Sequence, residues 1–335
     1  MKTTTAQPQA QTGAMTERRE NNSMQTASQN ETPLSVSALI CTRNREGSIA
    51  RAARSVLDNA DSETELIIVD QSGNDLTADA LAPLRLDSRL RYIRTDTLGK
   101  SAAVNIGIEA AKNEIIVMTD DDCVTLPGWT TAHSQVFRDN PNVVVAYGNV
   151  LPPEFDAKDG FTPVYQIKQD SVCHNMAQKL RARGIGANMA IRRDIALQIG
   201  GFDTELGPGA RFRACEDGDF AVRCLLAGYY TFETQGSSVI HYGFRTWAEG
   251  RQLTRDAFLG IGAAYIKPLK CGKLSVLPLL AYEFWTYALY PSLRATLTLR
   301  KPLNWQRVLC FLRGATRGLF APVDGKRLLY RPKNF

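Results

Sequence analysis

The feature that most constrains the fold is a regular alternation of short apolar runs with helical stretches, which begins at residue 34. Helical patterns occupy residues 47–60, about 76–83 and 101–112. Four apolar runs around them read as β-strands: VSALICT, ELIIVD, LRYIRT and EIIVMT. Strands that alternate with helices pair in parallel, so the pattern predicts an α/β fold with a mostly parallel sheet and helices on both faces.

Polar residues gather where the predicted strands end. The first strand runs into CTRNRE, the second into VDQSGND and the fourth into TDDDC. Ligands of such sheets bind in the crevice at the carboxyl ends of the strands. The sequence therefore predicts a binding crevice at this edge of the sheet.

Three consecutive aspartates, Asp120, Asp121 and Asp122, stand at that edge. In an extended chain Asp120 and Asp122 point to one side and Asp121 to the other. Two carboxylates on one side repel each other unless a cation lies between them. Oxygen ligands suit Mg²⁺ or Mn²⁺ better than zinc, so the pattern favours a divalent metal site. The alternative is a solvated acidic turn.

Seven segments occur in the order that is typical of family 2 glycosyltransferases. They are ALICTRNR, ELIIVDQSGND, GKSAAVNIGI, IVMTDDDC, GANMAIRRD, GGFDTELGPG and CEDGDFAVRCLLAGY. Over about residues 34–245 the chain therefore resembles that family. The resemblance implies the Rossmann-like GT-A fold and an inverting sugar transfer from a nucleotide-diphosphate sugar, helped by Mg²⁺ or Mn²⁺.

The resemblance also implies roles on the donor side. Thr42 and Arg43 would border the base and the diphosphate, and Asp70 would hydrogen-bond the base, usually a pyrimidine, which favours a UDP-type donor. Asp120 would lie near the ribose and the metal, and Asp122 would ligate the metal. Two of these residues have structural alternatives, because Asp70 could be a turn former and Arg43 a solvated loop charge.

One position departs from the family pattern. Val104 stands where family members often carry an arginine that helps to place the diphosphate, which leaves phosphate recognition in doubt. Lys100 opens the following predicted helix, where a cation is poorly placed unless an anion is also present. Lys100 is therefore a candidate phosphate contact, and a surface lysine is the alternative.

The second half of the resemblance covers the acceptor side. Asn188 is the candidate polar contact of the Gly-rich segment GIGANMAIRRD. By resemblance Asp217 is the general base and Glu216 orients the acceptor, whereas helix capping by one of them or by Asp219 is the structural alternative. His241 would complete the metal site, with a structural or solvated histidine as the alternative.

The C-terminal third is basic. From residue 251 to 335 there are 15 Lys and Arg against 3 Asp and Glu, so the preceding residues hold 25 against 31, and the two parts give the net charge of +6. Residues 274–299 are apolar and aromatic but interrupted by Pro278, Glu283 and Pro291. This pattern favours helices on an anionic membrane surface over a spanning helix, with a packed helical hairpin as the alternative.

These patterns divide the chain into a disordered tail at 1–33, a GT-A domain at 34–245 and a basic, aromatic-rich helical region at 246–335. The tail has no apolar core typical of a signal peptide. Seven cysteines without a CxxC pair fit a reducing cytoplasm. No nucleic-acid-binding module accompanies the basic residues, so nucleic acid is not an expected partner.

The sequence thus predicts a glycosyltransferase that uses a nucleotide-diphosphate sugar and a lipid-linked or saccharide acceptor in the synthesis of a cell-surface polysaccharide. We expect it in the cytoplasm, peripherally on the inner face of the cytoplasmic membrane. Two alternatives stay open. One is a sugar-nucleotide nucleotidyltransferase, for which CTRNREGS is a poor phosphate loop, and the other is a catalytically silent subunit that binds nucleotide sugars.

Overall fold

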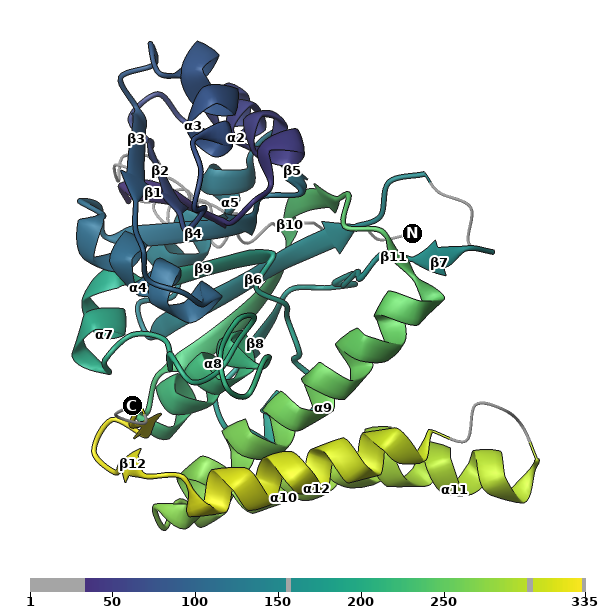
Figure 1. Cartoon of the computed structure of the whole chain (residues 1–335). Helices are drawn as coiled ribbons and strands as arrows, with labels where there is room; N and C mark the ends of the chain where they lie inside the picture. Colours follow the sequence, from purple (N-terminus) through teal and green to yellow (C-terminus); the bar gives the residue numbers. More distant parts are fainter. Residues whose placement is uncertain (1–33, 155–157, 300–303, 333–335) are drawn as a thin grey trace, which may run out of the picture. The chain divides into compact units, whose positions relative to one another are not determined.

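The structure is a computed structural model that describes residues 34–154, 158–299 and 304–332 (Figure 1). The predicted tail at residues 1–33 lies outside these ranges. The predicted boundary between residues 245 and 246 falls inside a short strand that immediately precedes a long helix, and it stays a prediction.

The alternation in the first half of the sequence produces the predicted strands and helices. These are β1 (Val36–Thr42), α2 (Glu46–Asn59), β2 (Glu65–Asp70), α3 (Leu76–Leu81), η1 (Ala82–Leu84), β3 (Leu90–Arg94), α4 (Lys100–Ala110) and β4 (Ile115–Asp120). β1 pairs in parallel with β2 and with β4, and β2 pairs in parallel with β3. Both Thr42 and Asp120 therefore stand at the same edge of the sheet.

The second half extends the sheet with strands of mixed direction. Its elements are β5 (Cys123–Thr125), α5 (Trp129–Asp139), β6 (Val143–Leu151), β7 (Gly160–Phe161), β8 (Ser171–Cys173), α6 (Met176–Lys179), β9 (Asn188–Arg192), α7 (Arg193–Gln198), α8 (Glu216–Leu226) and β10 (Tyr230–His241). The strand order is β3-β2-β1-β4-β9-β6-β10-β5, with β8 paired to β10. β9 runs antiparallel to both its neighbours, which the sequence pattern did not indicate.

Both faces of the sheet are buried, because alternate residues of each strand point to opposite sides. On one face Ala38 and Ile40 of β1 pack with apolar residues of α2 and α5. On the other face Leu39 packs with α4, α7 and α8. This arrangement confirms the predicted α/β fold with helices on both faces, and it leaves the polar strand ends free to form a crevice.

The C-terminal region is helical, as predicted. It contains β11 (Arg245–Thr246), α9 (Trp247–Lys270), η2 (Leu274–Val276), α10 (Leu277–Glu283), η3 (Phe284–Leu289, a π-helical turn), α11 (Tyr290–Leu297), α12 (Trp305–Phe320), β12 (Val323–Asp324) and β13 (Leu329–Tyr330). α12 packs along α9 and on η3 (Figure 1). A Cβ atom on Gly314 would lie 2.0 Å from the carbonyl oxygen of Leu259, so α9 and α12 approach each other through glycine.

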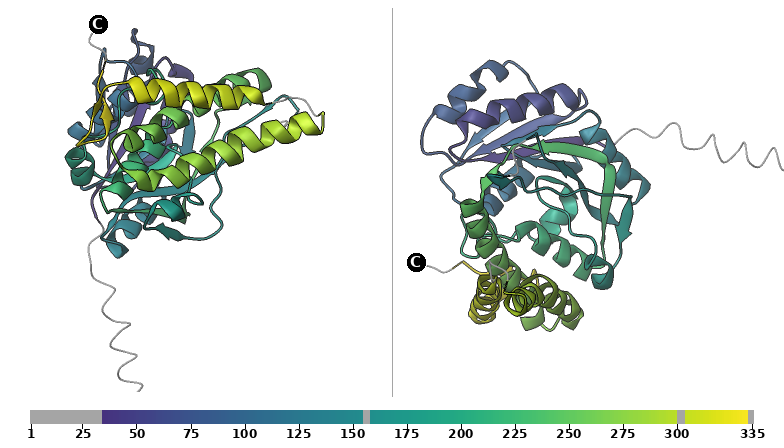
Figure 2. Two further views of the ribbon diagram at one scale, coloured as in Figure 1. Left: turned by 90° about the horizontal axis from the view of Figure 1, so that it is seen from below. Right: turned by 90° about the vertical axis from the view of Figure 1, so that its right-hand side faces the viewer.

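The region combines features of both interpretations that the sequence left open. Glu283 of α10 is buried and forms an ion pair with Arg183 at 3.0 Å, so this part packs on the domain. The C-terminal helices, drawn in green to yellow, lie together on one side of the described fold (Figure 2). Large apolar side chains are exposed on α11 and α12, among them Leu297 and Leu309, with the exposed Arg294 and Arg313 beside them in the sequence. None of the helices within the described ranges is long and apolar enough to cross a bilayer.

Candidate active site

A cleft of about 510 Å³ opens at the carboxyl ends of β1 and β4. Side chains from far apart in the sequence line it, including Arg43, all three residues Asp120–Asp122, Asp217 and His241. The β1–β4 pairing, the start of α8 and the end of β10 bring these residues together. The crevice predicted from the polar strand ends is thus present in the fold.

Asp120 forms an ion pair with Lys100, whose Nζ lies 2.5 Å from Asp120 Oδ1. Burial would lower the pKa of Lys100, but the charges of Asp120 and Glu216 raise it, so Lys100 is a permanent cation in the cleft. Val104 lies four residues later on α4 and therefore on the same helix face. The cation that the family pattern places at residue 104 is here one helical turn earlier.

Asp121 turns toward β1, where it accepts a hydrogen bond from the Thr42 hydroxyl at 2.7 Å. Burial raises the pKa of Asp121 to about 6, even though the hydrogen bond from Thr42 lowers it. Thr42, which the sequence assigned to the donor, is therefore engaged with a neighbouring carboxylate. Arg43 and Arg45 follow it in the turn after β1, and both line the cleft.

Asp122 meets His241 at the end of β10. His241 Nε2 lies 3.2 Å from Asp122 Oδ1, and both residues are buried. His241 Nδ1 lies 2.9 Å from the carbonyl oxygen of Pro163, to which it can donate only as an N–H. If the ring is neutral, its Nε2 lone pair then faces a carboxylate, which is unfavourable without a cation or proton between them.

The protonation of this pair follows the same geometry. Burial raises the pKa of Asp122, but the hydrogen bond to His241 and the nearby Arg45 and Arg245 lower it below its usual value. Burial lowers the pKa of His241, and the hydrogen bond to Asp122 raises it above its usual value. Either a proton on His241 Nε2 or a bound cation can therefore offset the charge of Asp122.

Asp122 and His241 also lie close enough together to bind one metal ion. Among the described residues, candidate ligand atoms of Asp122, Cys123 and His241 lie within 4.8 Å of one another. Burial raises the pKa of the Cys123 thiol well above its usual value, and Cys123 does not line the cleft. A carboxylate and an imidazole suit Mn²⁺ or Mg²⁺ when phosphate oxygens add further ligands. Asp120 lies outside this group.

Asp217 occupies the first turn of α8. Its Oδ2 accepts a hydrogen bond from the Gly186 N–H at 2.8 Å, and its Oδ1 accepts one from the Gly218 N–H at 2.7 Å. The N-cap position of the helix is Cys215, which makes no side-chain capping bond. Asp217 nevertheless satisfies one N–H of the first turn through its bond from Gly218. Asp217 is partly exposed to the cleft and is held in one orientation by backbone donors.

Glu216 lies beside Asp217 and is more deeply buried. Burial and the charge of Asp217 raise the pKa of Glu216 to about 7, against the opposing effect of Lys100. Glu216 can therefore hold a proton near neutral pH.

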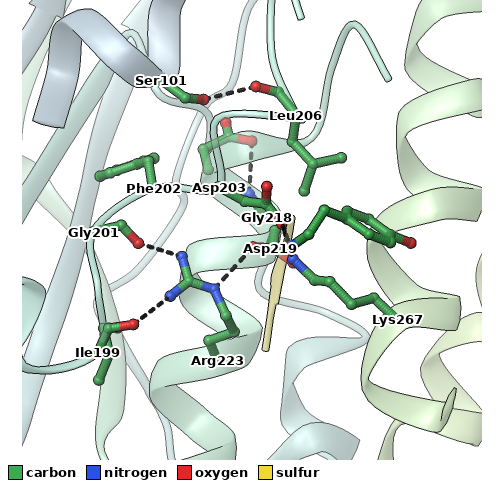
Figure 3. A network of polar contacts seen from close by, with 12 residues as sticks. Ser101, Ile199, Gly201, Phe202, Asp203, Leu206, Gly218, Asp219, Arg223 and Lys267 are labelled. Atoms are coloured by element: carbon green, nitrogen blue, oxygen red, sulfur yellow. Dashed lines mark hydrogen bonds and ion pairs between the residues drawn. The ribbon is translucent and has the colours of Figure 1, made fainter. Parts of the chain in front are cut away.

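A buried polar network anchors α8 from behind (Figure 3). Asp219 accepts from Arg223 Nε at 2.9 Å and lies 2.8 Å from Lys267 Nζ of α9. Lys267 also pairs with Asp203 at 2.5 Å, and Asp203 accepts from the Tyr330 N–H at 2.9 Å. Asp219 is therefore neither a cap nor a free base. The network joins the helix that carries Asp217 to α9 and to the end of the described chain.

Two predicted site residues do not line the cleft. Asp70 is fully buried, and its carboxylate accepts hydrogen bonds from the Ser72 N–H and the Tyr92 hydroxyl. Asn188 is also fully buried, and it bonds to Trp129 Nε1 and to the carbonyl oxygen of Asn149. Asn188 lies at the start of β9, whose pairing turns the side chain into the core. In this structure both residues have structural roles.

The structure adds cleft residues that the sequence reasoning missed. Arg45 belongs to the quoted CTRNRE segment, in which Thr42 and Arg43 were assigned roles but Arg45 was not. Arg245 lies four residues after His241, and its Nη2 is 3.9 Å from Asp122 Oδ2. Arg45 and Arg245, which both follow the ends of sheet strands, could have indicated an anionic ligand from the sequence alone.

Together these residues can assist a reaction in which an anion departs while a hydroxyl group loses a proton. Arginines, a lysine and a candidate metal pair can stabilise the developing negative charge. Asp217 can accept the proton in the same cleft.

Comparison with known families identifies this arrangement. Residues 37–200 match the family model described as Glycosyl transferase family 2. This part of the chain is similar to glycosyl transferase family 2. The match covers β4 and the turn after it, which carry Asp120 and Asp122, and it ends before α8, so Asp217 and His241 lie beyond it.

Relatives of the family 2 domain extend the likeness. A glucosyl-dolichyl phosphate glucuronosyltransferase from Haloferax volcanii is 26% identical over 181 residues, which is 52% of this chain and 58% of the relative. The chain spans less than two thirds of the length of the curated relatives that it matches first.

Solved structures share the fold over most of the chain. The mannosyltransferase PcManGT from Pyrobaculum calidifontis, solved with GDP-Man and Mn²⁺, has a TM-score of 0.58 at 15% identity and covers 91% of this chain and 94% of its own. TarS 1-349 from S. aureus has a TM-score of 0.58 at 14% identity and covers 85% and 82%. These likenesses confirm the GT-A fold predicted from the sequence.

Proposed function

We propose that this protein is an inverting glycosyltransferase that moves a sugar from a nucleotide-diphosphate sugar to a saccharide or lipid-linked acceptor. The observation that carries the proposal is the presence of the Asp122–His241 pair and Asp217 in one cleft of a family 2 domain. The Asp122–His241 pair is suited to hold a metal, and the Asp217 carboxylate is suited to accept a proton.

On the donor side, Asp122 and His241 would hold Mg²⁺ or Mn²⁺, whose charge stabilises the departing diphosphate when the ion is bound. Arg43, Arg45 and Lys100 supply further positive charge in the same cleft. Asp120 keeps Lys100 in place through their ion pair. The leaning toward a UDP-type donor rests on the resemblance alone, because Asp70 does not reach the cleft.

On the acceptor side, Asp217 removes the proton from the acceptor hydroxyl as its oxygen bonds to the anomeric carbon. The bond from that carbon to the diphosphate breaks on the opposite face, which inverts the configuration. The Gly186 and Gly218 N–H groups fix the orientation of the carboxylate. Glu216 can hold a proton near neutral pH. Its carboxyl group can then donate a hydrogen bond to an oxygen of the acceptor substrate and so orient that substrate.

The C-terminal helices support a role at a membrane. Exposed leucines and arginines alternate on α11 and α12, as on helices that lie in an anionic interface. The name of the Haloferax volcanii relative specifies a lipid phosphate. We therefore place the enzyme on the inner face of the cytoplasmic membrane, where it builds a cell-surface polysaccharide on a lipid-linked acceptor.

The same substitution at two carboxylates tests the proposal. Asp217→Asn should keep Mn²⁺-dependent binding of UDP, while turnover of the donor falls by about 10²–10⁴-fold because the amide cannot accept a proton. Asp122→Asn should lose the Mn²⁺-dependent part of UDP binding. Binding is measured by calorimetry, and turnover as UDP released from UDP-sugars with lipid extracts as acceptors. Normal turnover by Asp217→Asn would move the base elsewhere.

A further inference from the structure

A second cavity lies beside the start of α9, away from the residues assigned to the chemistry. It has a volume of about 670 Å³, and the first turns of α9 and of α12 form its walls. Leu253 of α9 lines the catalytic cleft, whereas the adjacent Thr254 and Arg251 line this groove. One helix therefore separates the two, and a ligand in the groove lies next to the site of transfer.

The groove is aromatic on its apolar side. Phe161 and Trp247 pack with ring centroids 5.7 Å apart, and Trp305 of α12 lines the groove with them. Both indole N–H groups are already used, by the Lys158 carbonyl and by the Thr296 hydroxyl, each at 2.9 Å. The rings therefore offer apolar faces, which suit a hydrocarbon chain.

The groove is cationic on its polar side. Arg251, Arg255 and Arg307 line it, and within the described ranges none of them forms an ion pair with a carboxylate. Arg255 donates to the Gln306 side chain at 2.9 Å. Arg307 Nε is buried without a hydrogen-bond partner among the described residues. A guanidinium that is partly buried without an anion is costly, unless a ligand supplies the anion.

The guanidinium of Arg307 has only weak contacts with its described neighbours. Its Nη1 reaches the Tyr287 carbonyl only at 3.4 Å, and its guanidinium lies 5.7 Å from the Phe258 ring centroid. Burial lowers the pKa of Arg307 below its usual value. The carboxylate of Asp256 on α9 is already paired with Arg213.

We infer that this groove binds the phosphate-bearing end of a prenyl-type lipid acceptor, with the arginines on the phosphate and the aromatic rings on the first part of the chain. The inference rests on the proposed lipid-linked acceptor and names its site. Exposed leucines of α12, including Leu309 and Leu312, continue from the groove and would lead the rest of the chain toward the bilayer. A sugar attached to the phosphate would then extend past α9 toward Asp217.

The probe is farnesyl phosphate, titrated into the full chain by calorimetry and compared with farnesol and with inorganic phosphate. Farnesyl phosphate should bind most tightly, because only it engages both sides of the groove. Arg307→Gln should weaken that binding by about 10–100-fold, as expected for loss of a charge-assisted hydrogen bond. Arg317→Gln removes the same charge from an exposed position in the last turn of α12 and should bind normally.

A second variant guards against misfolding. Arg251 and Arg255 are exposed, so Arg251→Gln/Arg255→Gln should keep the melting temperature and still lose affinity. Equal binding by the wild type and both groove variants would overturn the inference, as would equal binding of farnesol and farnesyl phosphate.

Two further arms separate the sources of phosphate and the two proposals. Phosphatidylglycerol vesicles should bind the groove variants and the wild type alike. If the vesicles displace farnesyl phosphate and the groove variants lose both, the site reads bulk lipid head groups and the inference fails. Binding of UDP with Mn²⁺ reports the donor site. A wild-type protein that binds farnesyl phosphate but does not bind UDP with Mn²⁺ would contradict only the proposed function.

Discussion

The sharpest prediction concerns Lys267, which connects α9 to the helix that carries Asp217. Lys267 is fully buried between Asp203 and Asp219, at 2.5 and 2.8 Å from their oxygens. With Arg223 the four side chains carry two positive and two negative charges, so the network is neutral. Lys267→Met keeps the length of the side chain but leaves one buried negative charge without compensation.

The expected cost follows from that imbalance. Removal of one partner of a buried ion pair costs about 3–5 kcal/mol, a large share of the roughly 5–15 kcal/mol that stabilises a typical protein. For a chain of this size that loss should lower the melting temperature by roughly 5–15 °C. Addition of Asp219→Asn restores neutrality and keeps an acceptor for Arg223, so the double variant should recover at least about 1.5 kcal/mol.

The pH dependence gives an independent check. In Lys267→Met the pKa of Asp203 or Asp219 should rise in the folded state, so the lost stability should return as the pH falls below that raised value. Thermal unfolding of the wild type and both variants at pH 5 and pH 8 measures this. A double variant that is no more stable than Lys267→Met at pH 8 would refute the argument, as would a stability of Lys267→Met that does not depend on pH relative to the wild type.

Three other predictions test the cleft and the helical face. Asp122→Ala should abolish the thermal stabilisation by UDP plus Mn²⁺, and unchanged stabilisation would remove Asp122 from the metal site. The pKa of Glu216 is raised from 4.5 to about 7. As the pH rises across that interval, the free energy of unfolding of the wild type should fall by up to about 3 kcal/mol relative to that of Glu216→Gln. A difference between the two proteins that does not depend on pH would contradict this. Leu309→Ser/Leu312→Ser should reduce binding to phosphatidylglycerol vesicles several-fold without changing UDP binding; sedimentation with the vesicles measures it, and an unchanged bound fraction would exclude this face as the contact.

Local pattern was sufficient to predict the first half of the fold. The strands β1, β2 and β4 are short apolar runs, and their burial on both faces requires no knowledge of distant partners. The same logic placed Asp120 and Asp122 at the sheet edge. The family resemblance then supplied Asp217 and His241, which the fold brings to the same cleft.

The sequence indicated less where distant pairing decides the direction of a side chain. Asn188 looked like a ligand in a Gly-rich turn, but antiparallel pairing of β9 with β4 and β6 turns it into the core. Lys267 and Asp203 are 64 residues apart, and a lysine in an apolar helix gives no local sign of its carboxylate partners. Asp120 and Asp122 do share a cleft, yet one pairs with Lys100 and the other with His241.

These distant contacts also explain why the C-terminal helices cannot be treated as a detachable anchor. Removal of the chain after α9 would remove α12, which contacts Leu259 through Gly314. It would also remove the hydrogen bond that the Tyr330 N–H donates to Asp203. It would also expose apolar residues of α9 such as Ala263. A truncated protein that fails to bind membranes would therefore report unfolding as readily as loss of a surface, so membrane attachment has to be tested by substitutions at exposed positions such as Leu309.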